Sequence, residues 1–130
     1  MPTTTTRLVI SSADLLSSTL AIDATATLTQ GGNTTAIAQT TGLGVTQAAD
    51  TNAFVLYAKG SYTDDEAAKV YLRNASTNAA HFVTVTIEAE DVGHLYAGDV
   101  ALIPWATTGD FKLKMSDASI KVEHILFHEG

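Results

Sequence analysis

The sequence predicts an all-β domain, an antiparallel β-sandwich or jelly roll of about eight strands. Apolar residues alternate with polar ones along several short runs, and side chains that alternate in this way lie on opposite faces of a strand. Clusters of Gly, Asn, Ser and Asp separate these runs about every eight to twelve residues, as turns do. No stretch sustains the 3.6-residue period of an amphipathic helix. The length of 130 residues suits one domain.

The N-terminal part is predicted to form an arm that precedes the sandwich. Thr3–Thr6 is β-branched but has no apolar face, so it is expected to be an extended segment that either frays or reaches a neighbouring subunit. Leu8–Ile10 is predicted to be a short apolar strand. We therefore divide the chain into an N-terminal arm or assembly segment, residues 1–16, and a single β-sandwich domain, residues 17–130.

Leu20–Thr29 has the most regular alternation in the chain. A strand here places apolar side chains on one face and mostly polar ones on the other, whereas a helix would scatter them. Gln30–Asn33 predicts a turn, and Thr34–Gln39 is predicted to return as the partner strand. The apolar face consists of Leu20, Ile22, Ala24, Ala26 and Leu28.

Lys69–Ile87 is predicted to form the centre of the domain. Two alternating runs flank Asn74–Ala80, whose small and polar residues favour a turn. The pattern therefore predicts a β-hairpin. Its core-facing side chains are expected to be Val70, Leu72, Val83, Val85 and Ile87.

The remaining strands follow from the same signals. Phe54–Ala58 is apolar on both faces, which predicts a central strand. Val100–Trp105 contains Pro104, which cannot donate a ladder hydrogen bond and so belongs at an edge, a strand end or a bulge. Phe111–Met115 alternates apolar residues with lysines, and Ile120–Phe127 is predicted to close the domain.

Charge and composition argue against several classes of partner. The net charge is −7 and only seven residues are Lys or Arg, so nucleic acids and anionic membranes are disfavoured. The chain has no cysteine, which excludes disulfides and thiolate metal sites. Residues 1–53 carry few charges but alternate regularly, which favours a surface that a partner covers. The sequence shows neither a signal-peptide pattern nor a membrane-length apolar run, so a soluble chain is expected.

No residue pattern supports catalysis or a cofactor. His124 and His128 have the spacing of a zinc motif, but on a strand they would lie about 13 Å apart, so structural roles are favoured. Asp64–Glu66 and Glu88–Asp91 lack the spacing of a calcium loop and are expected to be solvated. There is no nucleophile elbow and no phosphate-binding loop. We therefore expect no enzymatic activity and assign no catalytic, cofactor-binding or metal-binding residue.

The aromatic residues allow two interpretations. Trp105 and nearby tyrosines could form a platform for sugar binding, but packing in the core and at strand edges is the favoured interpretation. The tyrosines are Tyr57, Tyr62, Tyr71 and Tyr96.

The arrangement of strand and turn residues in the C-terminal half indicates a family. The segments concerned are Val70–Asn74, Phe82–Val85, Leu95–Asp99, Leu102–Trp105 and Lys121–Phe127. Together with Ser11–Thr41, they resemble small β-sandwich virion proteins of tailed bacteriophages, the capsid decoration or cement type. The resemblance implies a non-enzymatic protein, often trimeric, that binds the outer capsid surface and stabilises contacts between major capsid subunits. The alternative is a phage tail or fibre appendage domain that binds a host glycan through Trp105.

Overall fold

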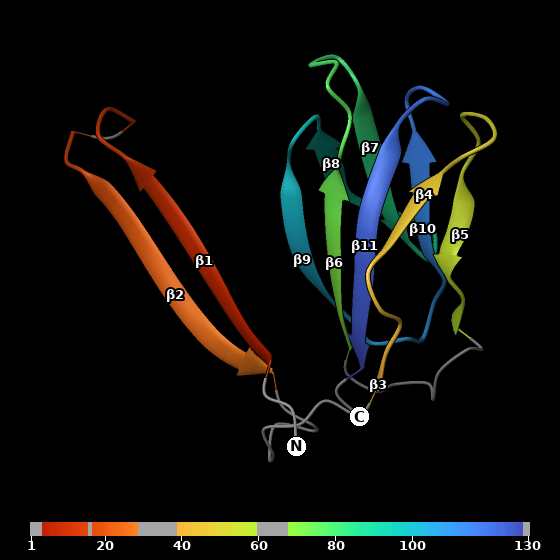
Figure 1. Cartoon of the computed structure of the whole chain (residues 1–130), viewed down its shortest axis with the longest axis horizontal. Coiled ribbons are helices and arrows are strands. Elements are labelled where there is room, and N and C mark those ends of the chain that lie inside the picture. Colours follow the sequence, from red (N-terminus) through yellow and green to blue (C-terminus); the bar gives the residue numbers. More distant parts are fainter. Residues whose placement is uncertain (1–3, 16, 29–38, 60–67, 129–130) are drawn as a thin grey trace.

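A computed structural model of the chain describes residues 4–15, 17–28, 39–59 and 68–128 (Figure 1). These residues form antiparallel strands, which confirms the all-β prediction. No helix in the described ranges is long and apolar enough to cross a membrane. The strands are β1 (Thr4–Ser12), β2 (Leu20–Leu28), β3 (Gln39–Thr40), β4 (Gly44–Gln47), β5 (Phe54–Tyr57), β6 (Ala68–Asn74), β7 (Phe82–Ile87), β8 (Glu90–Tyr96), β9 (Val100–Trp105), β10 (Phe111–Met115) and β11 (Lys121–His128).

Two sheets pack face to face and enclose one core. The five-stranded sheet has the order β3-β11-β6-β9, with β4 also paired to β11, and the four-stranded sheet has the order β5-β10-β7-β8. The pairs β4–β11, β5–β10, β6–β9 and β7–β8 are nested within one another along the chain. A long antiparallel hairpin rolled over into two sheets gives this nesting, and the result is a jelly roll.

The predicted hairpin at Lys69–Ile87 is wrong in its pairing. β6 lies in the five-stranded sheet and β7 in the four-stranded sheet, so the connection passes from one sheet to the other instead of turning within one sheet. The fully buried Asn74 fixes the crossing, because its side-chain Nδ2 donates to the carbonyl oxygen of Leu95 at 2.9 Å and its backbone N–H donates to that of Asp99 at 3.0 Å. The predicted core residues are confirmed: Val70, Leu72, Val83 and Val85 are buried, and Ile87 packs against them.

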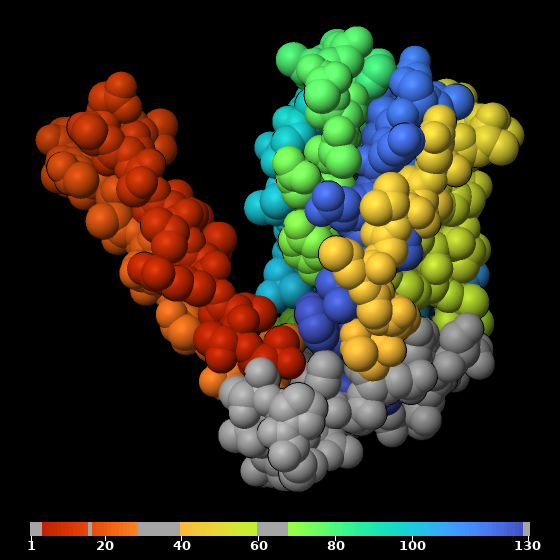
Figure 2. All heavy atoms as spheres, viewed as in Figure 1, coloured from red at the N-terminus to blue at the C-terminus, as the bar shows by residue number. Residues whose placement is uncertain are grey.

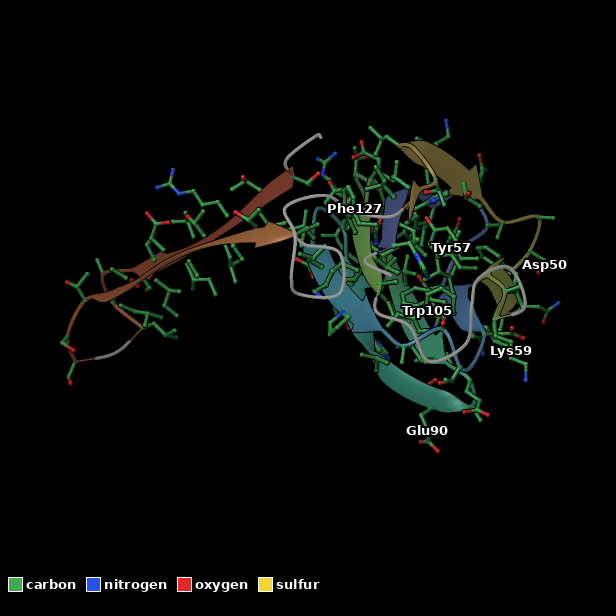
Figure 3. All side chains as sticks on the ribbon, turned by 90° about the horizontal axis from the view of Figure 1, so that it is seen from below. Asp50, Tyr57, Lys59, Glu90, Trp105 and Phe127 are labelled. Carbon is green, nitrogen blue, oxygen red and sulfur yellow. The ribbon has the colours of Figure 1, made fainter. Side chains whose placement is uncertain are left out.

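β10 supplies much of the core. Phe111, Leu113 and Met115 are fully buried, as the alternation predicts. An aromatic cluster lies at one end of the core, where the ring of Phe111 is 5.8 Å from that of Trp105 and 6.1 Å from that of Tyr57. In Figure 3 the labelled Tyr57 and Trp105 lie among the strands, whereas Lys59 and Glu90 lie at the periphery.

Two predictions about edge strands have opposite outcomes. Pro104 lies on β9, an edge strand, as its missing N–H requires. The prediction that Phe54–Ala58 is central is wrong, because β5 lies at the edge of its sheet. A register shift between Phe111 and Lys112 changes which side chains of β5 face inward, and Val55 remains 45% exposed.

β1 and β2 form a two-stranded sheet of their own. They pair along their full length from Thr4↔Leu28 to Ser12↔Leu20, so the partner of β2 precedes it in the chain. The predicted partner, Thr34–Gln39, lies outside the described residues except for Gln39, which pairs with β11. The hairpin stands apart from the sandwich (Figures 1 and 2). The domain boundary at residue 16 stays a prediction. The pairing of β2 with β1 associates β2 with the predicted arm.

Candidate functional site

The β1–β2 hairpin, called the arm below, has one apolar face. Leu8 lies opposite Ala24, and Ile10 lies opposite Ile22. Because paired residues share a face of a sheet, these four side chains form a continuous apolar strip, which Leu20 and Ala26 extend in the two directions. The predicted alternation of the second strand is therefore confirmed, and β1 matches it.

Most of this apolar face is open to solvent, although Leu28 at the end of β2 is buried. Leu8 is 55% exposed, Ile10 44% and Ile22 41%. Apart from their contact with each other, β1 and β2 make at most marginal contacts with the other described strands. An isolated two-stranded hairpin is marginally stable in water, and three or more strands or a packed face are normally needed. Within the described part of the chain, the arm therefore lacks the packing surface it needs.

The opposite face of the arm is polar and electrically balanced. The guanidinium of Arg7 donates to both carboxylate oxygens of Asp23, from Nε at 2.8 Å and from Nη2 at 2.6 Å. This pairing lowers the pKa of Asp23 and raises the pKa of Arg7. Exposed pairs contribute little stability. The charges of Arg7 and Asp23 cancel, so the two strands of the arm carry no net charge.

The five-stranded sheet also has apolar side chains on its outer face, interspersed with Lys69, Arg73 and Glu123. Its registers place Ile125, Tyr71 and Leu102 in one row across β11, β6 and β9, on the side away from the core. Leu102 is 39% exposed. Next to this row, Arg73 and Glu123 form an ion pair, with Nη1 3.3 Å from Oε1, so their charges cancel. We call this surface the outer apolar face; its residues are Val45, Tyr71, Val100, Leu102, Ile125 and Phe127.

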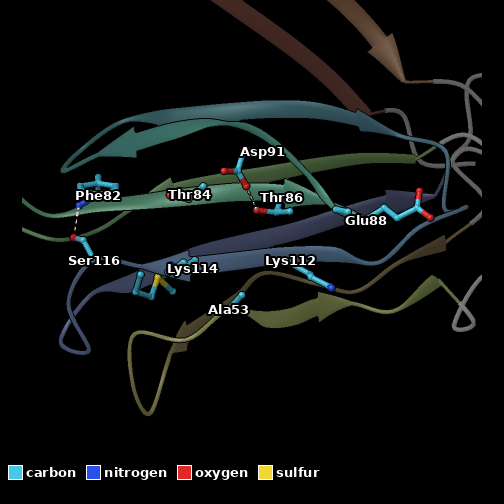
Figure 4. A pocket seen from close by; sticks show the side chains of 11 residues that line it. Ala53, Phe82, Thr84, Thr86, Glu88, Asp91, Lys112, Lys114 and Ser116 are labelled. Carbon is cyan, nitrogen blue, oxygen red and sulfur yellow. Dashed lines mark hydrogen bonds between the residues drawn. The ribbon is translucent and has the colours of Figure 1, made fainter.

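The four-stranded sheet presents a polar groove instead (Figure 4). The groove has a volume of about 440 Å³, and its lining includes Thr84, Thr86, Lys112 and Lys114. Among the described residues neither lysine takes part in an ion pair. Thr86 Oγ1 donates to Asp91 Oδ1 at 2.9 Å on the far wall.

An aromatic group adjoins this groove. The rings of Phe82 and His94 are stacked with centroids 4.7 Å apart and planes 8° apart, and Tyr96 lies 5.5 Å from Phe82. Tyr96 is 48% exposed, so the group offers a ring to solvent. This is the type of surface that binds the apolar face of a sugar.

Trp105 packs in the core, as the favoured interpretation predicts, so it does not form a sugar platform. It is 3% exposed, and its Nε1–H donates to the carbonyl oxygen of Gly109 at 2.9 Å. Tyr57 is also buried, and Tyr62 lies outside the described residues. The solvent-facing aromatic side chain next to a groove is Tyr96, which a sequence pattern without pairing information could not single out.

The histidines of β11 face the interior, in agreement with structural roles. His124 bridges the two sheets, with Nδ1 2.8 Å from the Tyr57 hydroxyl and Nε2 2.7 Å from the Thr46 hydroxyl. Burial lowers the pKa of His124. His128 is buried at the end of the same strand.

Ser76, His81 and Asp117 lie close together in the loops that join the sheets, and these residue types also occur in nucleophilic triads. Ser76 Oγ is 2.9 Å from His81 Nδ1, but His81 Nε2 is 3.7 Å from Asp117 Oδ2, beyond hydrogen-bond distance. Ser119 holds the other oxygen of Asp117 through its N–H and its hydroxyl, and these bonds lower the pKa of Asp117. The cluster therefore joins two loops and lacks the relay a nucleophile needs.

The acidic clusters form no metal centre in the described part of the chain, where no group of three or more His, Asp or Glu could hold an ion. Asp64–Glu66 lies outside the described residues. Glu88 has a left-handed backbone with φ of 58° and forms the tight turn between β7 and β8, so it serves the turn.

No known protein family, curated protein or solved structure matches this chain. The candidate functional sites are thus surfaces: the arm, the outer apolar face and the polar groove.

Proposed function

We propose that this protein is a non-enzymatic capsid decoration, or cement, protein of a tailed bacteriophage. It binds the outer surface of the capsid and stabilises contacts between major capsid subunits. The observation that carries the proposal is the arm: a nine-residue two-stranded ribbon whose apolar face is exposed and needs a protein surface to pack on.

Fold and residue patterns support the proposal without deciding it. Jelly rolls occur in viral capsid proteins and in lectins, so the fold is compatible with a virion role but does not imply one. The strand and turn segments that resemble decoration proteins add a second, independent reason. We further propose a homo-oligomer, a trimer by that resemblance, with the major capsid protein as partner and neither nucleic acid nor membrane as a ligand.

Electron cryomicroscopy of particles from the phage that encodes this chain tests the proposal. We expect density for the jelly roll on the capsid exterior, and a chain lacking residues 1–10 should occupy far fewer sites. Particles with the truncated chain should also release DNA at a lower temperature. Density confined to the tail, or full capsid occupancy without residues 1–10, would overturn the proposal.

One observation favours a second candidate, an appendage domain that binds a host glycan. Tyr96 and the Phe82–His94 stack lie beside a groove in which Lys112 and Lys114 lack ion-pair partners among the described residues. Such a site, which Glu88 and Asp91 also line, would suit a polar sugar. A glycan array decides between the candidates: saturable binding that is lost in Tyr96→Ala and retained in Tyr71→Ala, on the other sheet, would favour the appendage.

A further inference from the structure

We propose that the arm of one copy of this chain packs on the outer apolar face of a second copy, and that every copy both donates an arm and receives one. This inference identifies the surface on which the arm packs, and it does not rest on the capsid proposal. Where both hold, the arm serves the capsid role by assembling the oligomer that binds the capsid. The inference follows from how the two surfaces match in polarity and charge, and from the area that docked arms bury.

The two surfaces match in polarity. The arm offers Leu8, Ile10 and Ile22, and the outer apolar face offers Leu102 and Ile125 in its central row. The outer face of the four-stranded sheet is a poor alternative, because burying its lysine ammonium groups without partners would be costly.

The two surfaces also match in charge. The whole chain has a net charge of −7, so two copies repel each other over most of their surfaces. On the arm, Arg7 balances Asp23, and on the outer face of the five-stranded sheet Arg73 balances Glu123, while Lys69, between Phe127 and Pro104, adds a positive charge. Neither surface carries an excess of negative charge, so two copies can approach there without that repulsion.

The area that one docked arm buries indicates that arms are exchanged between copies. A nine-residue strand is about 30 Å long, and a two-stranded ribbon with its side chains is about 10 Å wide, so one arm covers about 300 Å². Counting both partners, one docked arm buries about 600 Å², less than a specific interface needs. Two exchanged arms bury about 1,200 Å², which reaches the lower limit, and a closed ring reaches the same area for each copy.

Matched variants on the arm and on the sheet test the inference by sedimentation. Ile10→Ser changes the apolar face of the arm, and Val9→Ser changes the neighbouring residue on its polar face, which is 57% exposed. On the sandwich, Leu102→Ser changes the receiving face, and Val55→Ser changes an exposed residue of the other sheet. We expect Ile10→Ser and Leu102→Ser each to weaken self-association by roughly tenfold or more, and both controls to leave it within about threefold. All four positions are exposed, and circular dichroism checks that each variant is folded.

Cross-linking in trans locates the contact directly. The natural chain has no cysteine, so single introduced cysteines report one site each. A mixture of Ile10→Cys chains and Leu102→Cys chains should form heterodimers with a short bismaleimide, and a mixture of Ile10→Cys with Val55→Cys should not.

Three results would overturn the inference. The first is that the natural chain stays monomeric at high concentration. The second is that Ile10→Cys and Leu102→Cys form a cross-link only when one chain carries both changes. The third is that Ile10→Cys forms a cross-link only to the major capsid protein. The last result would leave the capsid proposal standing. Conversely, an intact exchanged oligomer that never appears on capsids would sustain arm exchange and remove the capsid role.

Discussion

His124 joins the two sheets through hydroxyl groups of β4 and β5, and its burial links folding to pH. Burial keeps the pKa of His124 below its ordinary value of about 6.5, so the unfolded chain takes up this proton more readily than the folded chain. The unfolding free energy should therefore decrease as the pH falls from that ordinary value toward the lower pKa of the folded state. Above this range the contribution of His124 is constant.

Replacing His124 with Gln tests this linkage. Urea unfolding between pH 8 and pH 5 should show a smaller loss of stability with acidification in His124→Gln than in the natural chain. The difference between the two profiles isolates His124 from the other three histidines, which both chains share. Parallel profiles would show that His124 does not contribute to the pH dependence.

Asn74 should be the critical side chain of the crossing between β6 and β7. It is fully buried, its Nδ2 donates to the Leu95 carbonyl oxygen, and its Oδ1 accepts from the Ser76 N–H at 3.0 Å. Asn74→Ala removes both bonds and should cost about 1–3 kcal/mol of unfolding free energy. Asn78→Ala is the matched control, since Asn78 is exposed and makes a similar turn bond to the Ala80 N–H. Equal losses in the two variants would mean that burial of Asn74 is not what stabilises the crossing.

At the scale of strands, the sequence identifies the strands better than their partners. Alternation depends only on which side of a strand is buried, so it found the core residues Val70 and Val83 correctly. Two strands that face each other across a core have the same alternation as two that pair in one sheet. For that reason the alternation on either side of Asn74–Ala80 predicts a hairpin. The prediction of β5 as central has a different source, since the strand is apolar on both faces, but Val55 stays exposed at the sheet edge.

The surfaces show the same limit. Each half of the arm is visible in the sequence as an alternating run, but only the pairing of Leu8 with Ala24 and of Ile10 with Ile22 shows that the two apolar faces coincide. The outer apolar face combines residues from β4, β6, β9 and β11, which are far apart in the chain. No local pattern could have assembled it.

Turns that bring strands together are sensitive to one added carbon. A Cβ at Gly109 would lie 2.8 Å from the Cβ of Glu88, whose backbone already occupies the left-handed region. Gly109→Ala must therefore displace the turn that joins β7 and β8 and should cost about 1–3 kcal/mol. Gly93→Ala, within β8, meets nothing within 4 Å and should be neutral or slightly stabilising. Thermal unfolding of both variants checks this, and an unaffected Gly109→Ala would show that the turn adjusts freely.

At the scale of the whole molecule, the structure combines two parts with different requirements. The jelly roll encloses its own core of fully buried residues, so it holds together by its own packing. The arm has no comparable core within the described chain and depends on an external surface. Its stability should therefore depend on protein concentration, whereas that of the jelly roll should not.

Hydrogen exchange measured at two protein concentrations tests this difference. In dilute, monomeric solution the amides of β1 and β2 should exchange quickly, because a lone hairpin opens easily, while those of β6, β10 and β11 should stay protected. At concentrations where copies associate, protection should rise in β1 and β2, and Ile10→Ser should prevent the rise. Val9→Ser should behave as the natural chain does. Strong protection of the arm in the monomer would instead mean that the hairpin is stable alone, and its exposed apolar face would then no longer require a partner.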